Sequence, residues 1–300
     1  SVPTVNTPAP IVSTEPVFTN GVTSTPAVVR WDEVGAFKGT MALSDYFGAG
    51  TVRGTSDWIG RFYPHHFDTQ LSSPAGCSGF AYSGQPFTVL VTARNGLTPA
   101  GTTQNYHGAA SFARAVSLSE ENGVAGNIYV GATAGGSSAV PASVFDQGVG
   151  TVLHTATSNP SPVSYRFTAS PTLPSDIRVQ AEDADTLPTK AVNGGVDGIL
   201  NIRSGRLWLA NAFGSELLPL MLPARVQQYT SQGWVTNLSD SCTTLVTPVA
   251  DAGLTNTLKS LTVASLSAPV VAGDVRLRLS APGAGNTGLA DIGGAVLRGG

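Results

Sequence analysis

The clearest pattern in the chain is an alternation of apolar and polar residues that recurs in short segments. Residues 86–94 alternate almost perfectly from Phe87 to Arg94, and residues 163–167 and 177–181 repeat the pattern. A period of two residues is typical of a β-strand with one buried and one solvated face. Residues 1–25 differ, because proline recurs every few residues; this segment is expected to form an extended linker or an edge strand.

Alternating segments follow one another at a spacing of about 8–12 residues, which favours β-sandwiches. A polar, turn-rich stretch at residues 183–198 separates two such sets. We predict an all-β fold of tandem immunoglobulin-like antiparallel β-sandwiches with an extended N-terminal segment. The expected units are an arm with strands (1–56), a first sandwich (57–190) and a second sandwich (191–300). The expected strands are 78–82, 86–94, 105–118, 127–133, 149–157, 162–168 and 176–182, then 199–203, 206–213, 217–229, 233–238, 243–249, 258–266 and 270–280.

Residues 87–112 read as a β-hairpin whose loop is a candidate contact site. The first strand ends at Asn95-Gly96, and Thr102, Thr103 and Asn105 follow before the second strand is expected to begin. Turn and loop backbones favour such residues, so they have a purely structural interpretation. Loops supported by a rigid scaffold also bind partners, and these five residues are therefore candidates for contact with a ligand or partner.

The composition indicates an exported protein. Charged residues make up 12% of the chain, about half of the ~25% usual for globular domains. Threonine and valine suit strands, while 35 glycines and 20 prolines suit many turns. The net charge is −3 and no run of lysine or arginine occurs, which argues against nucleic acid and anionic membranes as partners. No apolar stretch approaches the ~20 residues needed to insert into a bilayer.

Cys77 and Cys242 are the two cysteines of the chain. In an extracellular protein an even number of cysteines without nearby metal ligands favours a disulfide. The alternative is a pair of buried free thiols.

Three acidic residues are candidate metal ligands. Glu182, Asp183 and Asp185 lie in the turn-rich stretch and offer the carboxylate oxygens that Ca²⁺ accepts. Solvated turn chemistry is the alternative, since the spacing is not that of an EF-hand. Apart from this calcium hypothesis, no cofactor is expected.

No catalytic motif is present. The chain lacks the G-x-S-x-G nucleophile elbow, and its four histidines cannot be paired with partners from the sequence. We therefore expect a protein without enzymatic activity. The four tryptophans, Trp31, Trp58, Trp208 and Trp234, are either core residues, as is usual in a sandwich, or a platform for stacking sugars.

Several stretches together resemble a known family, the uncharacterised C-terminal region of MshQ-like proteins. The match runs from about residue 28 to the end of the chain. The stretches are WDEVGAF (31–37), GRFYPHHF (60–67), CSGFAYSGQPFTVLVTARNG (77–96), TTQNYHG (102–108), GRLWLANAFGSELLPLMLPARVQQY (205–229), GWVTNLSDSCT (233–243) and LRLSAPGAGNTG (277–288). The family tends to carry an acidic residue where this chain has His65.

The resemblance implies a protein exported to the cell surface of a Gram-negative bacterium and linked to pilus assembly or adhesion. It implies no catalytic residues, and both cysteines fall in its recurrent motifs. We expect a structural or adhesive protein whose partners are other copies of itself or pilus and cell-surface proteins. Strand exchange between subunits is the expected mode of assembly. The alternative is a carbohydrate-binding, lectin-like surface module that binds glycans.

Overall fold

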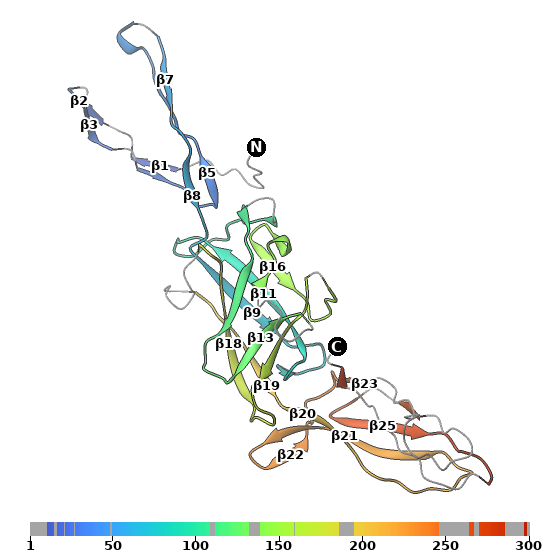
Figure 1. Ribbon diagram of the computed structural model, residues 1–300. Coiled ribbons are helices and arrows are strands. Elements are labelled where there is room, and N and C mark those ends of the chain that lie inside the picture. The colour runs from blue at the N-terminus through green and yellow to red at the C-terminus, as the bar shows by residue number, and fades with distance from the viewer. Residues whose placement is uncertain are drawn as a thin grey trace.

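Strands form nearly all of the regular structure in the computed structural model, as the sequence predicts. The described residues are 11–14, 17–20, 22–26, 28–48, 50–108, 112–131, 139–158, 160–185, 195–245, 264–266, 270–285 and 297–298. They include the short 3₁₀ turns η1 (Tyr46–Gly48) and η3 (Ala142–Val144). From the N-terminus, thin two-stranded ribbons lead into a central sandwich, and a second sheet follows at the other end (Figure 1).

The central sandwich consists of two sheets whose apolar faces meet. One sheet has the strand order β10-β19-β18-β12-β14, and the other has β13-β17-β11-β16-β15 with β9 along the second edge of β11. The bounds in the first sheet are β10 (Phe80–Tyr82), β19 (Gly198–Arg203), β18 (Ser175–Glu182), β12 (Val116–Glu120) and β14 (Ala139–Val140). The bounds in the second are β13 (Gly126–Val130), β17 (Val163–Phe167), β11 (Pro86–Arg94), β16 (Val149–Val152), β15 (Phe145–Asp146) and β9 (His66–Ser72). One pair departs from the antiparallel prediction, because β10 and β19 run parallel.

The core of the sandwich comes from the alternating positions of the sequence. Phe87, Val89 and Val91 of β11 are fully buried, and so are Ile177 and Val179 of β18 in the facing sheet. Each fully buried aliphatic or aromatic side chain contributes about 1.5–3 kcal/mol of hydrophobic stabilisation. The alternation therefore supplies the main driving force for joining the two sheets.

The hairpin expected at residues 87–112 forms only at its closed end, where Arg94 and Thr102 make an isolated antiparallel bridge and the N–H of Asn95 donates to the carbonyl of Gly101 (2.9 Å). The strand expected at 105–118 begins only at Val116. The chain leaves β11 at Arg94 and runs as a loop to Val116, where β12 begins in the opposite sheet. The other partners of β11 are β9 at residues 88–94, β16 at residues 89–92 and β17 at residues 86–87. The turn residues were identified correctly, but local turn chemistry does not specify which strand the returning chain joins.

The first sandwich extends past the boundary expected at residue 190. β19 follows that boundary, yet it pairs with β18 over residues 175–179 and with β10 on its other edge. The sandwich therefore continues to Arg203, and β20 begins the next sheet at Gly205.

Four two-stranded antiparallel ladders precede the sandwich; we call them the N-terminal ladders (Figure 1). They pair β1 (Ile11–Thr14) with β4 (Val28–Arg30), β2 (Val17–Thr19) with β3 (Val22–Thr25), β5 (Gly35–Phe37) with β8 (Ile59–Phe62), and β6 (Thr40–Leu43) with β7 (Val52–Thr55). The arm expected at 1–56 thus continues through β8.

The β5–β8 ladder is attached to the sandwich at Gly35. Gly35 has φ +130°, and a Cβ there would lie 3.1 Å from Cζ of Phe112. Its neighbour Val34 is buried in the sandwich core. A glycine is therefore required at this position, because both the backbone conformation and the close approach of Phe112 disfavour a side chain.

The C-terminal sheet has the order β20-β21-β25-β24, with β22 also paired to β21. Its strands are β20 (Gly205–Leu209), β21 (Leu220–Thr230), β22 (Gly233–Thr236), β24 (Ala264–Leu266) and β25 (Asp274–Leu279), and β23 (Thr244–Leu245) pairs separately with β26 (Leu297–Arg298).

Proline inside a sheet is usually confined to edge strands, yet β21 contains Pro223 and is paired on both edges. Pro223 fits because its carbonyl accepts a bond from the Ala210 N–H beyond the last pair of β20 and β21. Its nitrogen faces that same side, so no ladder bond to β25 is lost.

Among the residues that the structure describes, no helix has the length and apolar character needed to cross a bilayer.

Candidate functional site

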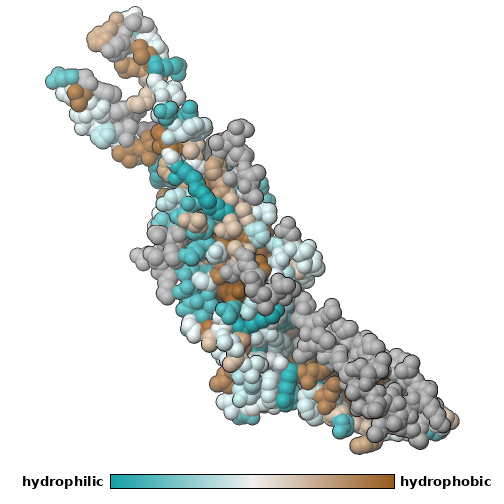
Figure 2. All heavy atoms as spheres, in the orientation of Figure 1, coloured by the Kyte–Doolittle hydropathy of each residue, from teal (hydrophilic) through white to brown (hydrophobic). Residues whose placement is uncertain are grey.

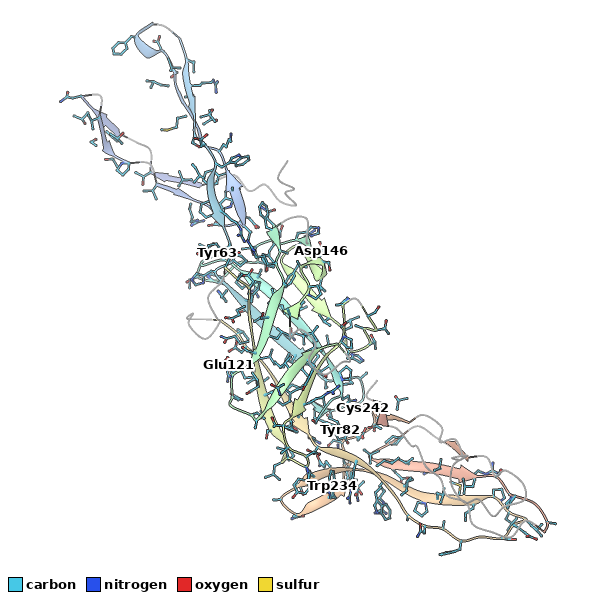
Figure 3. The ribbon with its side chains drawn as sticks, viewed as in Figure 1. Tyr63, Tyr82, Glu121, Asp146, Trp234 and Cys242 are labelled. Atoms are coloured by element: carbon cyan, nitrogen blue, oxygen red, sulfur yellow. A yellow bond between two sulfur atoms is a disulfide. The ribbon has the colours of Figure 1, made fainter. Side chains whose placement is uncertain are left out.

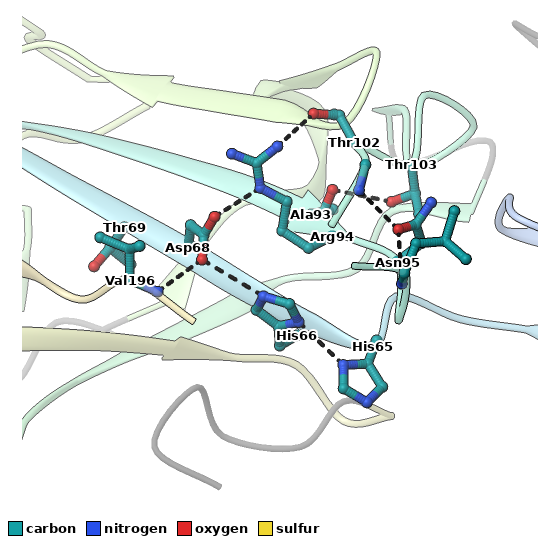
Figure 4. A network of polar contacts seen from close by, with 12 residues as sticks. His65, His66, Asp68, Thr69, Ala93, Arg94, Asn95, Thr102, Thr103 and Val196 are labelled. Carbon is teal, nitrogen blue, oxygen red and sulfur yellow. Dashed lines mark hydrogen bonds and ion pairs between the residues drawn. The ribbon is translucent and has the colours of Figure 1, made fainter. Parts of the chain in front are cut away.

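The loop that follows β11 is held in shape by its own first residue. The Oδ1 atom of Asn95 accepts hydrogen bonds from the backbone N–H groups of Gly101 (2.8 Å) and Leu97 (3.2 Å) (Figure 4). Gly96 lies against the ring of His65, and a Cβ on it would come 3.3 Å from that ring. Asn95 and Gly96 are therefore used to close the loop.

Thr102 connects the same loop to an ion pair on the sandwich. Its Oγ1 accepts a bond from Arg94 (2.9 Å), whose Nε lies 2.7 Å from Oδ2 of Asp68 on β9 (Figure 4). The other oxygen of Asp68 accepts a 2.8 Å bond from the N–H of Val196, just before β19. Three segments far apart in the sequence thus meet at one half-buried carboxylate.

Thr103 and Asn105 are buried rather than presented to solvent, with 2% and 1% of their surfaces exposed. The buried carboxylate of Glu33 accepts bonds from the backbone N–H groups of Gln104 (2.9 Å) and Asn105 (3.0 Å). The Asn105 side chain donates in turn to the carbonyl of Val34 (3.3 Å). The structure therefore places this part of the loop against the chain's own N-terminal segment, at the base of the β5–β8 ladder.

His66 is buried beside this loop. Its Nε2 lies 3.5 Å from Asp68, and its Nδ1 lies 3.1 Å from Nδ1 of His65. Burial lowers the pKa of His66; Asp68 opposes this shift, while His65 and Arg94 add to it. His66 is therefore held mainly neutral at pH 7.

The three acids proposed for calcium are not gathered around a common point. Asp183 accepts a bond from the hydroxyl of Tyr106 (2.8 Å), and Asp185 pairs with Arg61 and with Arg114. Glu182 is exposed on β18. Burial and the neighbouring Asp183 raise the pKa of Tyr106, so its hydroxyl remains a donor. The carboxylates of Asp183 and Asp185 thus act as acceptors that hold loop and strand together, and Arg61 and Arg114 already supply positive charge to Asp185.

Cys77 and Cys242 form a disulfide across 165 residues, with their Cα atoms 4.9 Å apart. Cys77 lies between β9 and β10 of the sandwich, and Cys242 follows β22 of the C-terminal sheet. The bond therefore links the two units, close to Tyr82 (Figure 3).

Asp240 organises the junction around this disulfide. Its Oδ1 accepts bonds from the N–H groups of Cys242 (3.0 Å) and Thr243 (2.9 Å), and its Oδ2 accepts from the hydroxyls of Thr243 (2.6 Å) and Tyr82 (2.9 Å). Burial, with the nearby Asp240 charge, raises the pKa of Tyr82. Asn237 donates to Tyr82 Oη (2.6 Å) and accepts from Arg203 (3.1 Å).

Cys77, Cys242 and Asp240 also place their ligand atoms within 4.8 Å of one another. The two sulfurs are joined to each other and so are not the thiolates that bind metals. The oxygens of Asp240 are occupied by hydrogen bonds. This donor set does not fit a cation.

Glu33 and Asp240 were missed by the sequence interpretation. Asp240 could have been found from its position two residues before Cys242. In loops, an Asp side chain commonly accepts a hydrogen bond from the backbone N–H of the residue two positions later. Nothing local distinguishes Glu33, whose partners lie more than 70 residues away.

Of the two alternatives for the tryptophans, the core position is wrong, because none of the four belongs to the core. Trp58 is 58% exposed and Trp208 is 38% exposed, while Trp31 and Trp234 are half-buried. Indole surface is thus available on the N-terminal ladders and on the C-terminal sheet.

Comparison with known protein families assigns both parts of the chain. Residues 33–204 match the model of the third domain of DUF6701, and residues 203–297 match that of the fourth. The chain belongs to the DUF6701 family. The two matches meet where β19 ends and β20 begins. Membership agrees with the resemblance at the level of uncharacterised β-rich domains, while the closer assignment to MshQ-like proteins remains a prediction.

A solved structure with some similarity is that of FdeC, an Escherichia coli adhesin. The two chains are 12% identical, with a TM-score of 0.30, and the match covers 77% of this chain and 60% of that one. No curated protein is significantly similar to the DUF6701 chain.

Proposed function

We propose that this DUF6701 chain is a non-catalytic, extracellular structural or adhesive protein, associated with a pilus or filament, that acts through exposed β surfaces. Copies would associate through the N-terminal ladders by strand exchange, and the other partners would be pilus or cell-surface proteins. Location outside the cell is supported by the disulfide, since such bonds persist in oxidising compartments.

The observation that carries this proposal is the exposure of the N-terminal ladders. All described residues of β3, β6 and β7 are exposed, and Val22, Met41 and Phe47 are 70%, 56% and 91% exposed. Figure 2 shows apolar surface at this end of the molecule. A two-stranded ladder that buries little is marginally stable in water, and clustered apolar surface typically marks an interaction site. A strand from another copy would stabilise both edges of such a ladder.

A depression on the central sandwich supports a non-catalytic role. It is lined by the connection between β12 and β13 and contains the carboxylate of Glu120. That carboxylate accepts bonds from the backbone N–H groups of Asn122 (2.7 Å) and Val124 (2.9 Å), which hold the turn. The acid is thus engaged in turn structure rather than poised for proton transfer.

Assembly of the full chain tests the proposal. We expect oligomers by sedimentation velocity and regular filaments by electron microscopy, and monomers after deletion of residues 1–30. Phe47→Ser should weaken assembly, whereas Phe213→Ser, which changes an equally exposed (90%) phenylalanine of the C-terminal part, should leave it unchanged. A full chain that stays monomeric, or a deletion that assembles normally, would refute the proposal.

Carbohydrate binding is a second candidate function. It is favoured by Trp208 and Trp234, which lie on β20 and β22 of the C-terminal sheet.

A further inference from the structure

The C-terminal sheet has one apolar and one polar face. Along β21, Ala224 and Val226 are buried, and along β25 Val275 and Leu277 are buried. Because side chains alternate, the residues between them point to the opposite, solvent-facing side. Residues directly opposite one another in the register share that face, which places Met221 beside Arg278 and Pro223 beside Arg276. We call this side the outer face.

Arginines are concentrated on the outer face. Arg225, Arg276 and Arg278 are exposed there, and Arg206 lies opposite Gln227 on the neighbouring pair of strands. The chain has 16 lysines and arginines in all, so a quarter of them lie on this one face of a protein whose net charge is −3. Among the described strand residues of this face, the acidic group is Asp274, whose carboxylate is 3.8 Å from Nε of Arg276.

Aromatic rings alternate with these cations. Trp208 lies directly opposite Arg225. The guanidinium of Arg206 on β20 stacks 4.5 Å from the centre of the Trp234 ring on β22. The Trp234 ring also contacts Tyr229, near the C-terminal end of β21, with 5.4 Å between the ring centres. Trp234 lies on β22, near the bend of the molecule (Figure 3). The outer-face residues of β21 extend from Met221 to Tyr229, which is eight residue steps along the strand, or roughly 27 Å.

We propose that the outer face binds an acidic polysaccharide, one that carries carboxylate or sulfate groups. Guanidinium groups bind such anions with paired, charge-assisted hydrogen bonds, and indole rings present flat apolar surfaces on which the C–H faces of sugar rings pack. Neighbouring arginines on β25 are two residues apart, about 7 Å, which suits regularly repeated charges. The face is open and elongated, and therefore accommodates a polymer rather than enclosing a small molecule.

A polysaccharide is favoured over nucleic acid by charge and location. Nucleic-acid binding surfaces generally belong to domains with a strong positive balance, whereas this chain is acidic overall. The proposed extracellular location, on which this inference rests, also places the face where acidic polysaccharides occur. It deepens the proposed function by naming the ligand class of one surface.

Binding of the full, disulfide-bonded chain to dextran sulfate and to neutral dextran tests the inference. We expect binding to dextran sulfate that weakens with added NaCl, and no binding to dextran. The double variant Arg276→Gln/Arg278→Gln should lower the affinity about tenfold or more, which corresponds to one or two lost charge-assisted bonds. Trp208→Ala should lower the affinity while leaving its salt dependence unchanged, because it removes packing and no charge.

The matched control is Arg114→Gln/Arg178→Gln, which removes the same charge from exposed positions on the central sandwich, outside both the N-terminal ladders and the outer face. It should alter the affinity less than about twofold, as expected for remote surface charges. The inference would be overturned if this control lost as much affinity as Arg276→Gln/Arg278→Gln, or if the wild-type chain did not bind dextran sulfate. It would also be overturned if the chain bound single-stranded DNA more tightly than dextran sulfate in a Trp208-dependent way. Sedimentation of the same variants separates the two proposals, since assembly depends on the N-terminal ladders and not on these arginines.

Discussion

At the scale of single residues, carboxylates are placed where distant backbone groups need an acceptor. Glu33 accepts from residues 104 and 105, Asp68 from Val196, and Asp240 from Cys242 and Thr243. Buried N–H groups without partners are costly, so each of these acids makes a specific arrangement of loops favourable. They act as structural acceptors.

The first prediction concerns Glu33. Glu33→Ala leaves the N–H groups of Gln104 and Asn105 without this acceptor and should lower the free energy of unfolding by about 1–3 kcal/mol. Chemical denaturation of the full chain measures this change. Glu33→Gln retains one acceptor oxygen and should show a smaller loss; equal stability of Glu33→Ala and wild type would contradict the role assigned to this carboxylate.

The second prediction concerns pH. The pKa of His66 is lowered from its usual 6.5, so as the pH falls below about 6.5 the unfolded chain takes up a proton that the folded chain does not. The stability contributed by the neutral imidazole is therefore present above pH 6.5 and is lost as the pH falls toward the folded-state pKa. We expect His66→Gln to reduce the slope of stability against pH between 6.5 and 5, measured by thermal unfolding. Parallel stability profiles for wild type and His66→Gln would contradict this assignment. The control is His154→Gln, because the His154 ring contacts Thr88 on another part of β11.

At the scale of elements, pairing partners decide where one unit ends. β19 lies between β10 and β18, so it is an interior strand of its sheet although it follows a turn-rich segment. Removing it would leave one edge of β18 unpaired and would take its own buried side chains Leu200 and Ile202, which are 4% and 0% exposed, out of the core.

The third prediction follows from this pairing. A fragment of residues 33–204 carrying Cys77→Ser should fold and unfold cooperatively, because it contains both sheets of the sandwich. A fragment of residues 33–190 with the same substitution lacks β19 and should be unfolded or aggregated. Circular dichroism and two-dimensional NMR distinguish the outcomes, and a well-folded 33–190 fragment would show that β19 is dispensable.

At the scale of the whole molecule, the units follow one another along an extended chain (Figure 1). The disulfide and the hydrogen bonds of Tyr82, Asn237 and Asp240 join the sandwich to the C-terminal sheet. Extended, jointed molecules of this kind present several separate surfaces to partners, which suits the structural role proposed above.

The fourth prediction concerns this junction. In Cys77→Ser/Cys242→Ser we expect each unit to keep its strands, because the core of the sandwich and the pairing of the C-terminal sheet do not include the sulfurs. The relative position of the two units should become more variable, and small-angle X-ray scattering should report a broader distribution of interatomic distances. Tyr82→Phe, which removes one hydroxyl and leaves the disulfide, should broaden the distribution less. Unchanged scattering of the double variant would mean that the noncovalent contacts alone fix the junction.

The sequence by itself determined several of the strands. The alternation at 86–94 and 176–182 marks β11 and β18 within one residue, since strand periodicity is a local property of neighbouring side chains. The same local reasoning identified the turn at Asn95-Gly96 and indicated the disulfide between the only two cysteines.

Only the tertiary structure decided which strands pair and which polar groups are buried. The loop after β11 crosses to the other sheet, β19 joins the sandwich that precedes it, and Glu33 and Asn105 are buried together although 72 residues separate them. The choice between core and surface positions for the tryptophans was likewise decided only by the fold, which exposes Trp58 and Trp208. These outcomes depend on contacts between segments distant in sequence, whose energies no local pattern contains.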